Sequence, residues 1–299
     1  MKPFVLTVLL FSIASRAATP GLRLNPDLVR PWSKELSASD PFPCPYLATF
    51  KKDGFVLAYL AATHANQESD PTMTLLRRTL ENGSFKAVMF EGFPFDASSS
   101  DQERYLQYAE RTRRGGLLEG GEDAYAAILA HSKGLPFYGG EPTEPQVLQG
   151  VLARGYSARD LVGFSIVRMI PVWTRDGELK GKSLDALADD RLRSECRGYR
   201  LEPAACPDLD SLKFWYRTKN GEEFGEPFDG EKAAPYPGGK YFTQRLSAAV
   251  DDVRNRAVVE HIEKLLRKHG KILVVYGGSH LTMQSKAFEA ALGTPTYSR

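Results

Sequence analysis

The stretch Lys271-Ile-Leu-Val-Val-Tyr-Gly-Gly-Ser-His280 indicates how the chain is expected to fold. Its apolar run, Ile272 to Tyr276, is uninterrupted and rich in β-branched residues. A short apolar run that ends at glycine is typical of a strand buried on both faces, as in a parallel sheet. Gly277-Gly278 permits a sharp turn, and His280 follows, where open α/β sheets bind ligands. His280 is therefore expected to lie beyond the buried run, where its replacement should cost no more stability than a polar surface change.

Three further predicted strands end in the same way. The strand at 55–62 is followed by His64, the strand at 87–90 by Glu91, and the strand at 135–138 by a turn that contains Glu141. Capping residues and apolar periodicity predict helices near 70–81, 100–114, 122–133, 144–153, 158–169, 244–269 and 281–292. This alternation predicts an α/β fold, with a mainly parallel sheet flanked by helices.

Two segments interrupt this rhythm. Residues 18–50 are rich in proline and predict an extended N-terminal arm that wraps the domain. Residues 171–242 hold aromatic residues among glycine, proline and charges. Because the segment lacks a clear apolar core, we expect an irregular insertion or lid rather than an independent domain. Residues 51–299, with this insertion, are expected to form a single domain.

The N-terminus has the pattern of a signal peptide. Lys2 supplies the positive charge, Phe4 to Ile13 the apolar run, and Ser15-Arg16-Ala17 the small residues of a cleavage site. Removing residues 1–17 leaves 37 basic and 37 acidic side chains, which argues against nucleic acid or an anionic membrane as a partner. The rest of the chain has no apolar stretch long enough to span a bilayer. We expect a periplasmic or secreted protein with a peptide or small-molecule substrate.

Cysteine usage agrees with export. Cys196 and Cys206 lie ten residues apart in a polar segment and predict a disulfide. Paired C-x-x-C spacings, which a zinc ribbon needs, do not occur in the sequence. Cys44 is left over, either buried and inert or free.

Because parallel strands end at the same edge of a sheet, His64, Glu91, Glu141 and His280 are expected to lie together. They could supply nitrogen and oxygen ligands to a divalent metal ion, which would lower the pKa of a bound water. They could equally act without metal, as general base and acid. Arg254, on the helix before the last strand, is either a solvated charge, a partner of Asp251 or Asp252 in an ion pair, or a clamp for an anionic substrate.

The same residues carry a resemblance to a known family. Val253-Arg-Asn-Arg, the strand, and Gly277-Gly-Ser-His-Leu281 resemble the end of the TraB/GumN and Tiki family, whose final motif is G-x-x-H-L. Ala61-Ala-Thr-His64 and Phe90-Glu91-Gly92 resemble its first motifs, with Ala61 where the family has glycine. Gly140-Glu141-Pro142 resembles an acidic turn of the wider group that includes the erythromycin esterases and the ChaN haem-binding lipoproteins. The resemblance spans roughly 55–145 and 245–292.

This resemblance implies a metal-dependent protease. His64, Glu91 and His280 would hold the metal or its water, Glu141 would be a ligand or base, and Arg254 would support the site. The expectation is thus an exported, metal-dependent hydrolase of peptide or amide bonds. Two alternatives stay open: a metal-free esterase of the erythromycin-esterase type, and a non-enzymatic haem-binding or other ligand-binding protein of the ChaN type.

Overall fold

A computed structural model describes residues 21–299 apart from residues 117 and 226. In this part of the chain six strands form one sheet in the order β4-β3-β5-β2-β1-β6. The strands β4, β3, β5 and β2 run parallel to one another, whereas β1 pairs antiparallel with both β2 and β6. The strand bounds are Tyr46–Lys52 (β1), Phe55–Ala62 (β2), Ala87–Pro94 (β3), Phe137–Glu141 (β4), Lys271–Gly277 (β5) and Thr296–Ser298 (β6). The predicted α/β fold with a mainly parallel sheet is confirmed.

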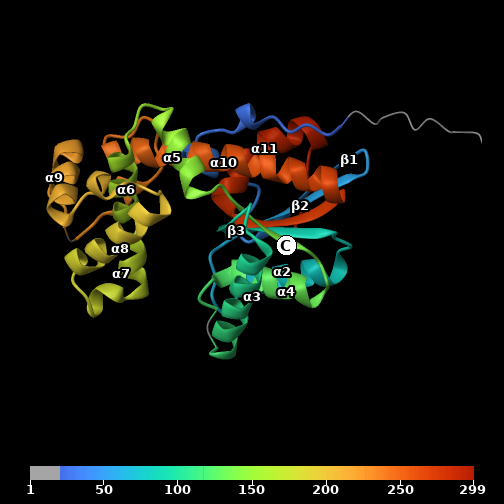
Figure 1. The fold of residues 1–299 in the computed structure, drawn as a ribbon. Helices are drawn as coiled ribbons and strands as arrows, with labels where there is room; N and C mark the ends of the chain where they lie inside the picture. Colours follow the sequence, from blue (N-terminus) through green and yellow to red (C-terminus); the bar gives the residue numbers. More distant parts are fainter. Residues whose placement is uncertain (1–20, 117, 226) are drawn as a thin grey trace, which may run out of the picture.

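Helices cover both faces of the sheet (Figure 1). The expected helices are present, with bounds close to those expected. They are α2 (Pro71–Asn82), α3 (Ser99–Arg114), α4 (Gly121–Ser132), α5 (Glu144–Leu152), α6 (Ala158–Val167), α10 (Phe242–His269) and α11 (Gly278–Leu292). Along β5, Val274 packs with α10 and α11 on one face, and Val275 packs with α2 and α4 on the other. Two buried faces explain why the sequence of this strand is apolar throughout.

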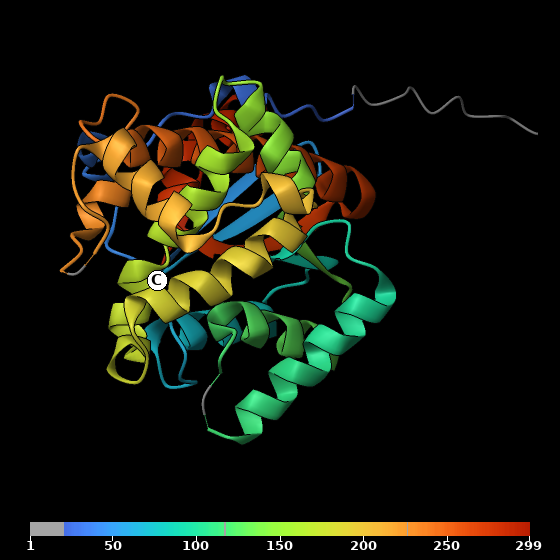
Figure 2. The ribbon, with the colours of Figure 1, turned by 60° about the vertical axis from the view of Figure 1, so that its left-hand side comes forward.

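The segment 171–242 differs from the expectation. It contains the helices α7 (Ile170–Asp176), α8 (Leu184–Gly198) and α9 (Leu209–Asn220). Its apolar side chains, including Trp173, Leu187 and Trp215, are buried in a cluster shared with α5, α6 and the start of α10. The expectation of an irregular insertion without an apolar core is therefore wrong. We call helices α5 to α9 the helical unit; it lies beyond the carboxyl ends of the parallel strands (Figures 1 and 2).

Helix α10 connects the two parts of the molecule. Leu246 and Val250 on its first half are buried in the cluster of the helical unit. Val258 and Ile262 on its second half are buried against the sheet. The apolar stripe seen in the sequence is therefore divided between two cores, and Arg254 lies on the turn where α10 passes from one to the other.

The N-terminal arm packs on the domain as expected. Leu22, Leu24 and Val29 are buried against α10 and α11, and the arm contains the short helices η1 (Pro26–Leu28) and α1 (Lys34–Ser37). The end of the predicted arm, however, belongs to β1, which forms a hairpin with β2. The predicted signal peptide, residues 1–17, lies outside the described residues. Within the ranges given above, no helix is both long and apolar enough to cross a membrane.

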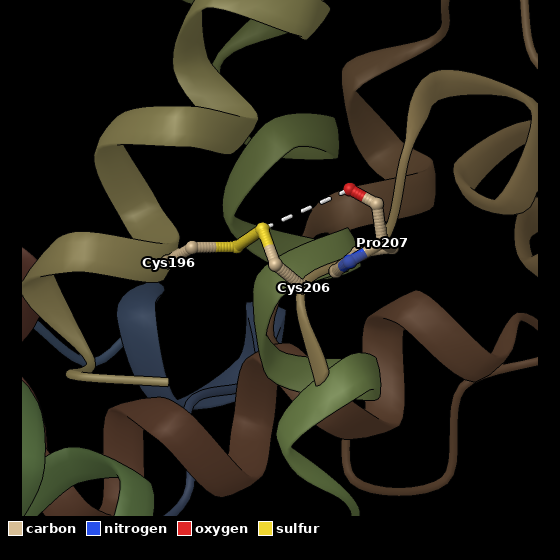
Figure 3. Close-up of a disulfide and its surroundings, with 3 residues drawn as sticks. All are labelled: Cys196, Cys206 and Pro207. Carbon is tan, nitrogen blue, oxygen red and sulfur yellow. Dashed lines mark hydrogen bonds between the residues drawn. A yellow bond between two sulfur atoms is a disulfide. The ribbon is translucent and has the colours of Figure 1, made fainter. Parts of the chain in front are cut away.

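The predicted Cys196–Cys206 disulfide is confirmed, with 5.8 Å between the two Cα atoms (Figure 3). It ties the end of α8 to the loop that precedes α9. Cys44 is free and half-buried, and burial raises the pKa of its thiol.

Candidate active site

The strand ends bring three of the four predicted residues into one hydrogen-bonded network. Glu91 lies within β3, beside the irregular register that follows Phe90, and Glu141 is the last residue of β4. His280 lies in the first turn of α11, directly after β5. Together with Arg254 of α10, these residues form what we call the strand-end cluster.

Arg254 is the centre of this cluster. Its Nε and Nη2 donate to the two carboxylate oxygens of Glu141 at 2.8 and 2.7 Å, and Nη2 also donates to Glu91 at 3.1 Å. Asp251 is a weaker partner at 3.7 Å, whereas Asp252 pairs with Arg154 and Arg256. The guanidinium is thus engaged by the two site carboxylates rather than left free to clamp an anionic substrate.

Both carboxylates are held in their charged form. Burial opposes the charge of Glu91, but His280, Arg254 and the backbone N–H of Gly277, which donates at 3.0 Å, together hold its pKa well below the ordinary value. Burial likewise opposes the charge of Glu141, and Arg254 lowers its pKa. The hydroxyl of Tyr276 adds a donor to Glu141 at 3.2 Å.

His280 is buried rather than exposed at a turn. Helix α11 begins at Gly278, and this turns the His280 side chain toward α10, where only 9% of it is exposed. Asn255 Oδ1 lies 2.9 Å from His280 Nδ1 and also accepts from Gln284. The expectation that replacing His280 would cost little stability is therefore wrong, because a buried hydrogen-bonded group would be lost.

The contacts of His280 also fix its charge. Because Asn255 Oδ1 is an acceptor, His280 Nδ1 carries a proton. Its Nε2 lies 3.3 Å from Glu91 Oε1, and two lone pairs would repel each other there unless Nε2 is protonated as well. Burial opposes that charge, but Glu91 raises the pKa of His280 above its ordinary value. His280 is thus a cation that donates to Glu91.

His64 lies at the same edge of the sheet but has a different partner. Its Nδ1 is 2.7 Å from Glu122 Oε1, and the other oxygen of Glu122 accepts the backbone N–H of Ala65 at 3.0 Å. The His64 side chain is 69% exposed, whereas that of Glu122 is 4% exposed. The hydrogen bond that His64 donates to Glu122 raises the pKa of His64 despite partial burial, and the charge of Glu91 raises it further.

Two acidic residues of α4 were missed in the sequence. Glu122 and Asp123 stand in the first turn of a helix, where acids are common because they complement the helix dipole. Asp123 Oδ1 is buried without a hydrogen-bond partner among the described residues. Burial raises the pKa of Asp123 well above its ordinary value, and nearby Glu122, Glu91 and Glu141 add to the shift. The site therefore holds a carboxyl group with a raised pKa beside Glu91 and Glu141, whose pKa values are lowered.

The four predicted metal ligands are not arranged as ligands around one metal ion would be. Within residues 21–299, leaving out 117 and 226, no three histidine, cysteine or acidic side chains are placed as a metal-binding group. The oxygens of Glu91 and Glu141 already accept from Arg254 and other donors, and His280 Nε2 faces Glu91. As arranged here, these four residues do not fit a resident metal ion.

Comparison with known proteins adds no assignment: no family model, curated protein or solved structure matches this chain.

Proposed function

We propose that the protein is a hydrolase of ester or amide bonds in which His64 acts as the general base. The observation that carries the proposal is the hydrogen bond between His64 Nδ1 and the buried Glu122 carboxylate. Because Glu122 accepts a hydrogen bond from Nδ1–H, the neutral His64 ring carries its proton on Nδ1 and presents a lone pair on Nε2. Within the described part of the chain this Nε2 has no hydrogen bond, and the side chain is exposed to solvent.

The chemistry follows from this arrangement. His64 Nε2 takes a proton from a water molecule that attacks the substrate carbonyl, and it later returns the proton to the leaving group. Glu122 keeps the ring in the correct tautomer and stabilises the imidazolium that forms, as a buried carboxylate does for a catalytic histidine. The charge of Glu91 acts on this base, and Glu91 belongs to the hydrogen-bonded strand-end cluster at the same edge of the sheet.

Metal-dependent hydrolysis is the second candidate. A histidine whose Nδ1 donates to a carboxylate is typical of metal sites, because this contact orients Nε2 toward the ion. His64 has that contact. A divalent ion would supply an activated water there, but Glu91, Glu141 and His280 would first have to leave their present partners.

We also propose that the protein acts after export, in the periplasm or outside the cell. The Cys196–Cys206 disulfide supports this location, since such bridges persist in oxidising compartments.

The test uses a panel of para-nitrophenyl esters and chromogenic peptide amides, assayed with and without a chelator. Turnover that persists in the chelator and disappears in His64→Ala supports the proposal. Turnover that is lost in the chelator and restored by one divalent metal supports the second candidate instead. Absence of turnover on the whole panel, with a visible absorption band on haem titration, would replace both by the ligand-binding alternative.

A further inference from the structure

A polar cavity of about 220 Å³ lies where the N-terminal arm, β1 and α11 meet. Strand β1 contributes Tyr46, Ala48 and Phe50 to its wall. These are alternate residues, so they stand on one face of the strand, and α11 packs over that strand. Because Ala48 is small and stands between two aromatic residues, the surface of the strand is hollowed there beneath the helix.

The arm brings a cation, Arg30, to this cavity. Arg30 Nη2 donates to the carbonyl of Thr282 at 3.0 Å and to Ser285 Oγ at 3.1 Å, and these contacts fix the guanidinium against α11. Its Nε is buried without a partner, and its Nη1 has no hydrogen bond, in the part of the chain that the structure describes. The guanidinium is therefore held in place while some of its N–H groups stay unused.

The arm also brings an anion, Asp40, to the same cavity. Both oxygens of Asp40 accept from the single hydroxyl of Thr282, at 2.7 and 2.8 Å, although a carboxylate has about four lone-pair sites. Burial raises the pKa of Asp40, and the Thr282 hydroxyl and the charge of Arg30 oppose this shift. Among the described residues, however, no hydrogen bond or ion pair joins Arg30 to Asp40. Two opposite charges thus line one cavity without forming a pair.

A buried hydroxyl in the wall of the cavity is also without a partner. Tyr46 is only 1% exposed, and its hydroxyl has no hydrogen bond within residues 21–299, leaving out 117 and 226. Buried tyrosine hydroxyls usually have a hydrogen-bond partner. The other charged residues of the wall, Lys286 and Glu289, pair with each other at 2.7 Å. The unused groups of the cavity are therefore a guanidinium, a carboxylate and a hydroxyl.

We propose that this cavity binds a small zwitterion, an α-amino acid, with the ligand carboxylate on Arg30 and the ligand ammonium on Asp40. Both contacts are charge-assisted hydrogen bonds, the strong kind. A simple anion would satisfy Arg30 but face the charge of Asp40, and a simple cation would do the reverse, whereas a zwitterion satisfies both. The cavity is smaller than the roughly 300–1,000 Å³ of pockets for drug-sized ligands, which suits an amino acid. The inference is independent of the proposed function, since no residue of the strand-end cluster takes part.

The test is titration calorimetry with L-alanine and with two analogues that each lack one of its charges. Propionate lacks the ammonium group, and ethylamine lacks the carboxylate. We expect saturable binding of L-alanine, and binding of each analogue that is weaker by about tenfold or more, as expected for loss of a hydrogen bond between charged groups. Absence of L-alanine binding, or equal binding of either analogue, would overturn the inference and leave a hollow that holds only water.

Two conservative variants locate the binding in this cavity. Asp40→Asn removes the charge but keeps an acceptor for Thr282, and Tyr46→Phe removes only the hydroxyl. We expect the affinity for L-alanine to fall by about tenfold or more in Asp40→Asn and by about threefold or more in Tyr46→Phe. Glu35→Gln, an exposed change on the same arm, should leave the affinity within about twofold of the parent. Urea unfolding shows that each variant is folded, and an unchanged affinity in either of the first two would reject the site.

Discussion

The two histidines that end β2 and β5 have similar sequence contexts and opposite surroundings. Each is the fourth residue of a similar motif, Ala61-Ala-Thr-His64 and Gly277-Gly-Ser-His280. His280 is buried, donates to a neutral amide and faces a carboxylate with its second nitrogen. His64 is exposed and pairs with a buried carboxylate through Nδ1, which leaves its second nitrogen open.

This difference assigns different tasks to the two rings. A base needs a free lone pair, and in this structure His64 has one while His280 uses both nitrogens. A cation that neutralises buried carboxylates needs partners on several sides, and His280 has them. Under the proposed function His64 would transfer the proton, whereas His280 is placed to neutralise the buried carboxylates of the strand-end cluster.

The largest effect is expected from His64→Ala. Loss of a general base should reduce turnover by about 10²- to 10⁴-fold. The free energy of unfolding should change by no more than about 0.5 kcal/mol, because the side chain is largely exposed. Ester turnover and urea unfolding of the same sample check both values. Near-normal turnover would show that His64 is only a loop residue.

Arg254→Ala should have the next largest effect, on stability. It leaves Glu91 and Glu141 buried without their main counter-charge, and removing one partner of a buried ion pair typically costs about 3–5 kcal/mol. Arg256→Ala, two residues along α10 and more exposed, should cost about 1 kcal/mol or less. Urea unfolding measures both variants. Equal costs would mean that the strand-end cluster contributes no more than a surface ion pair.

The sequence predicted the strand ends well because a buried parallel strand leaves a strong signal. The apolar runs before His64, Glu91 and His280 have few structural interpretations other than buried strands, and the carboxyl ends of parallel strands lie at one edge of the sheet. Arg254 was singled out, but its partners were not, because Glu141 is 113 residues away and only the folded sheet brings the two together.

Other features gave weaker signals. The hairpin of β1 and β2 turns at Asp53-Gly54, a dipeptide typical of tight hairpins, but the neighbouring prolines favoured an arm. Glu122 resembles any acid in a first helical turn, and nothing in the sequence marks it as the partner of His64. The burial of the His280 side chain depends on the residue at which α11 begins, and helix bounds are difficult to predict to within two residues.

Glu122→Gln tests why His64 differs from His280. Glu122 accepts from His64 Nδ1–H and from the Ala65 N–H through different oxygens, and glutamine replaces one of them with an NH₂ donor, so one of these hydrogen bonds is lost. We expect turnover to fall by about 10- to 100-fold, as when the carboxylate that orients a functional histidine is lost. Because Glu122 raises the pKa of His64, the acid limb of the pH–rate profile should also move to lower pH.

Glu119→Gln, in the loop before α4, is the control, since Glu119 contacts Tyr108 and lies outside the site. It should leave the rate and the profile unchanged. An acid limb that stays in place in Glu122→Gln would separate Glu122 from the base.

The smallest effect is the pH dependence of the stability that His280 contributes. The pKa of His280 is raised above 6.5 because Glu91 outweighs the cost of burial, and the pKa of Glu91 is lowered below 4.5. A raised histidine pKa stabilises the fold fully below 6.5 and loses this contribution as the pH rises through the folded-state pKa. A lowered carboxylate pKa stabilises above 4.5 and loses its contribution as the pH falls.

The ion pair between Glu91 and His280 should therefore contribute most between about pH 4.5 and 6.5. His280→Gln cannot carry the charge, so its deficit in unfolding free energy should be greatest in that window and shrink above it. His131→Gln, an exposed change on α4, controls for the loss of a histidine elsewhere. Urea unfolding across the pH range measures the difference. A deficit that does not vary with pH would mean that His280 is neutral in the folded protein, and the contrast with His64 would then rest on burial alone.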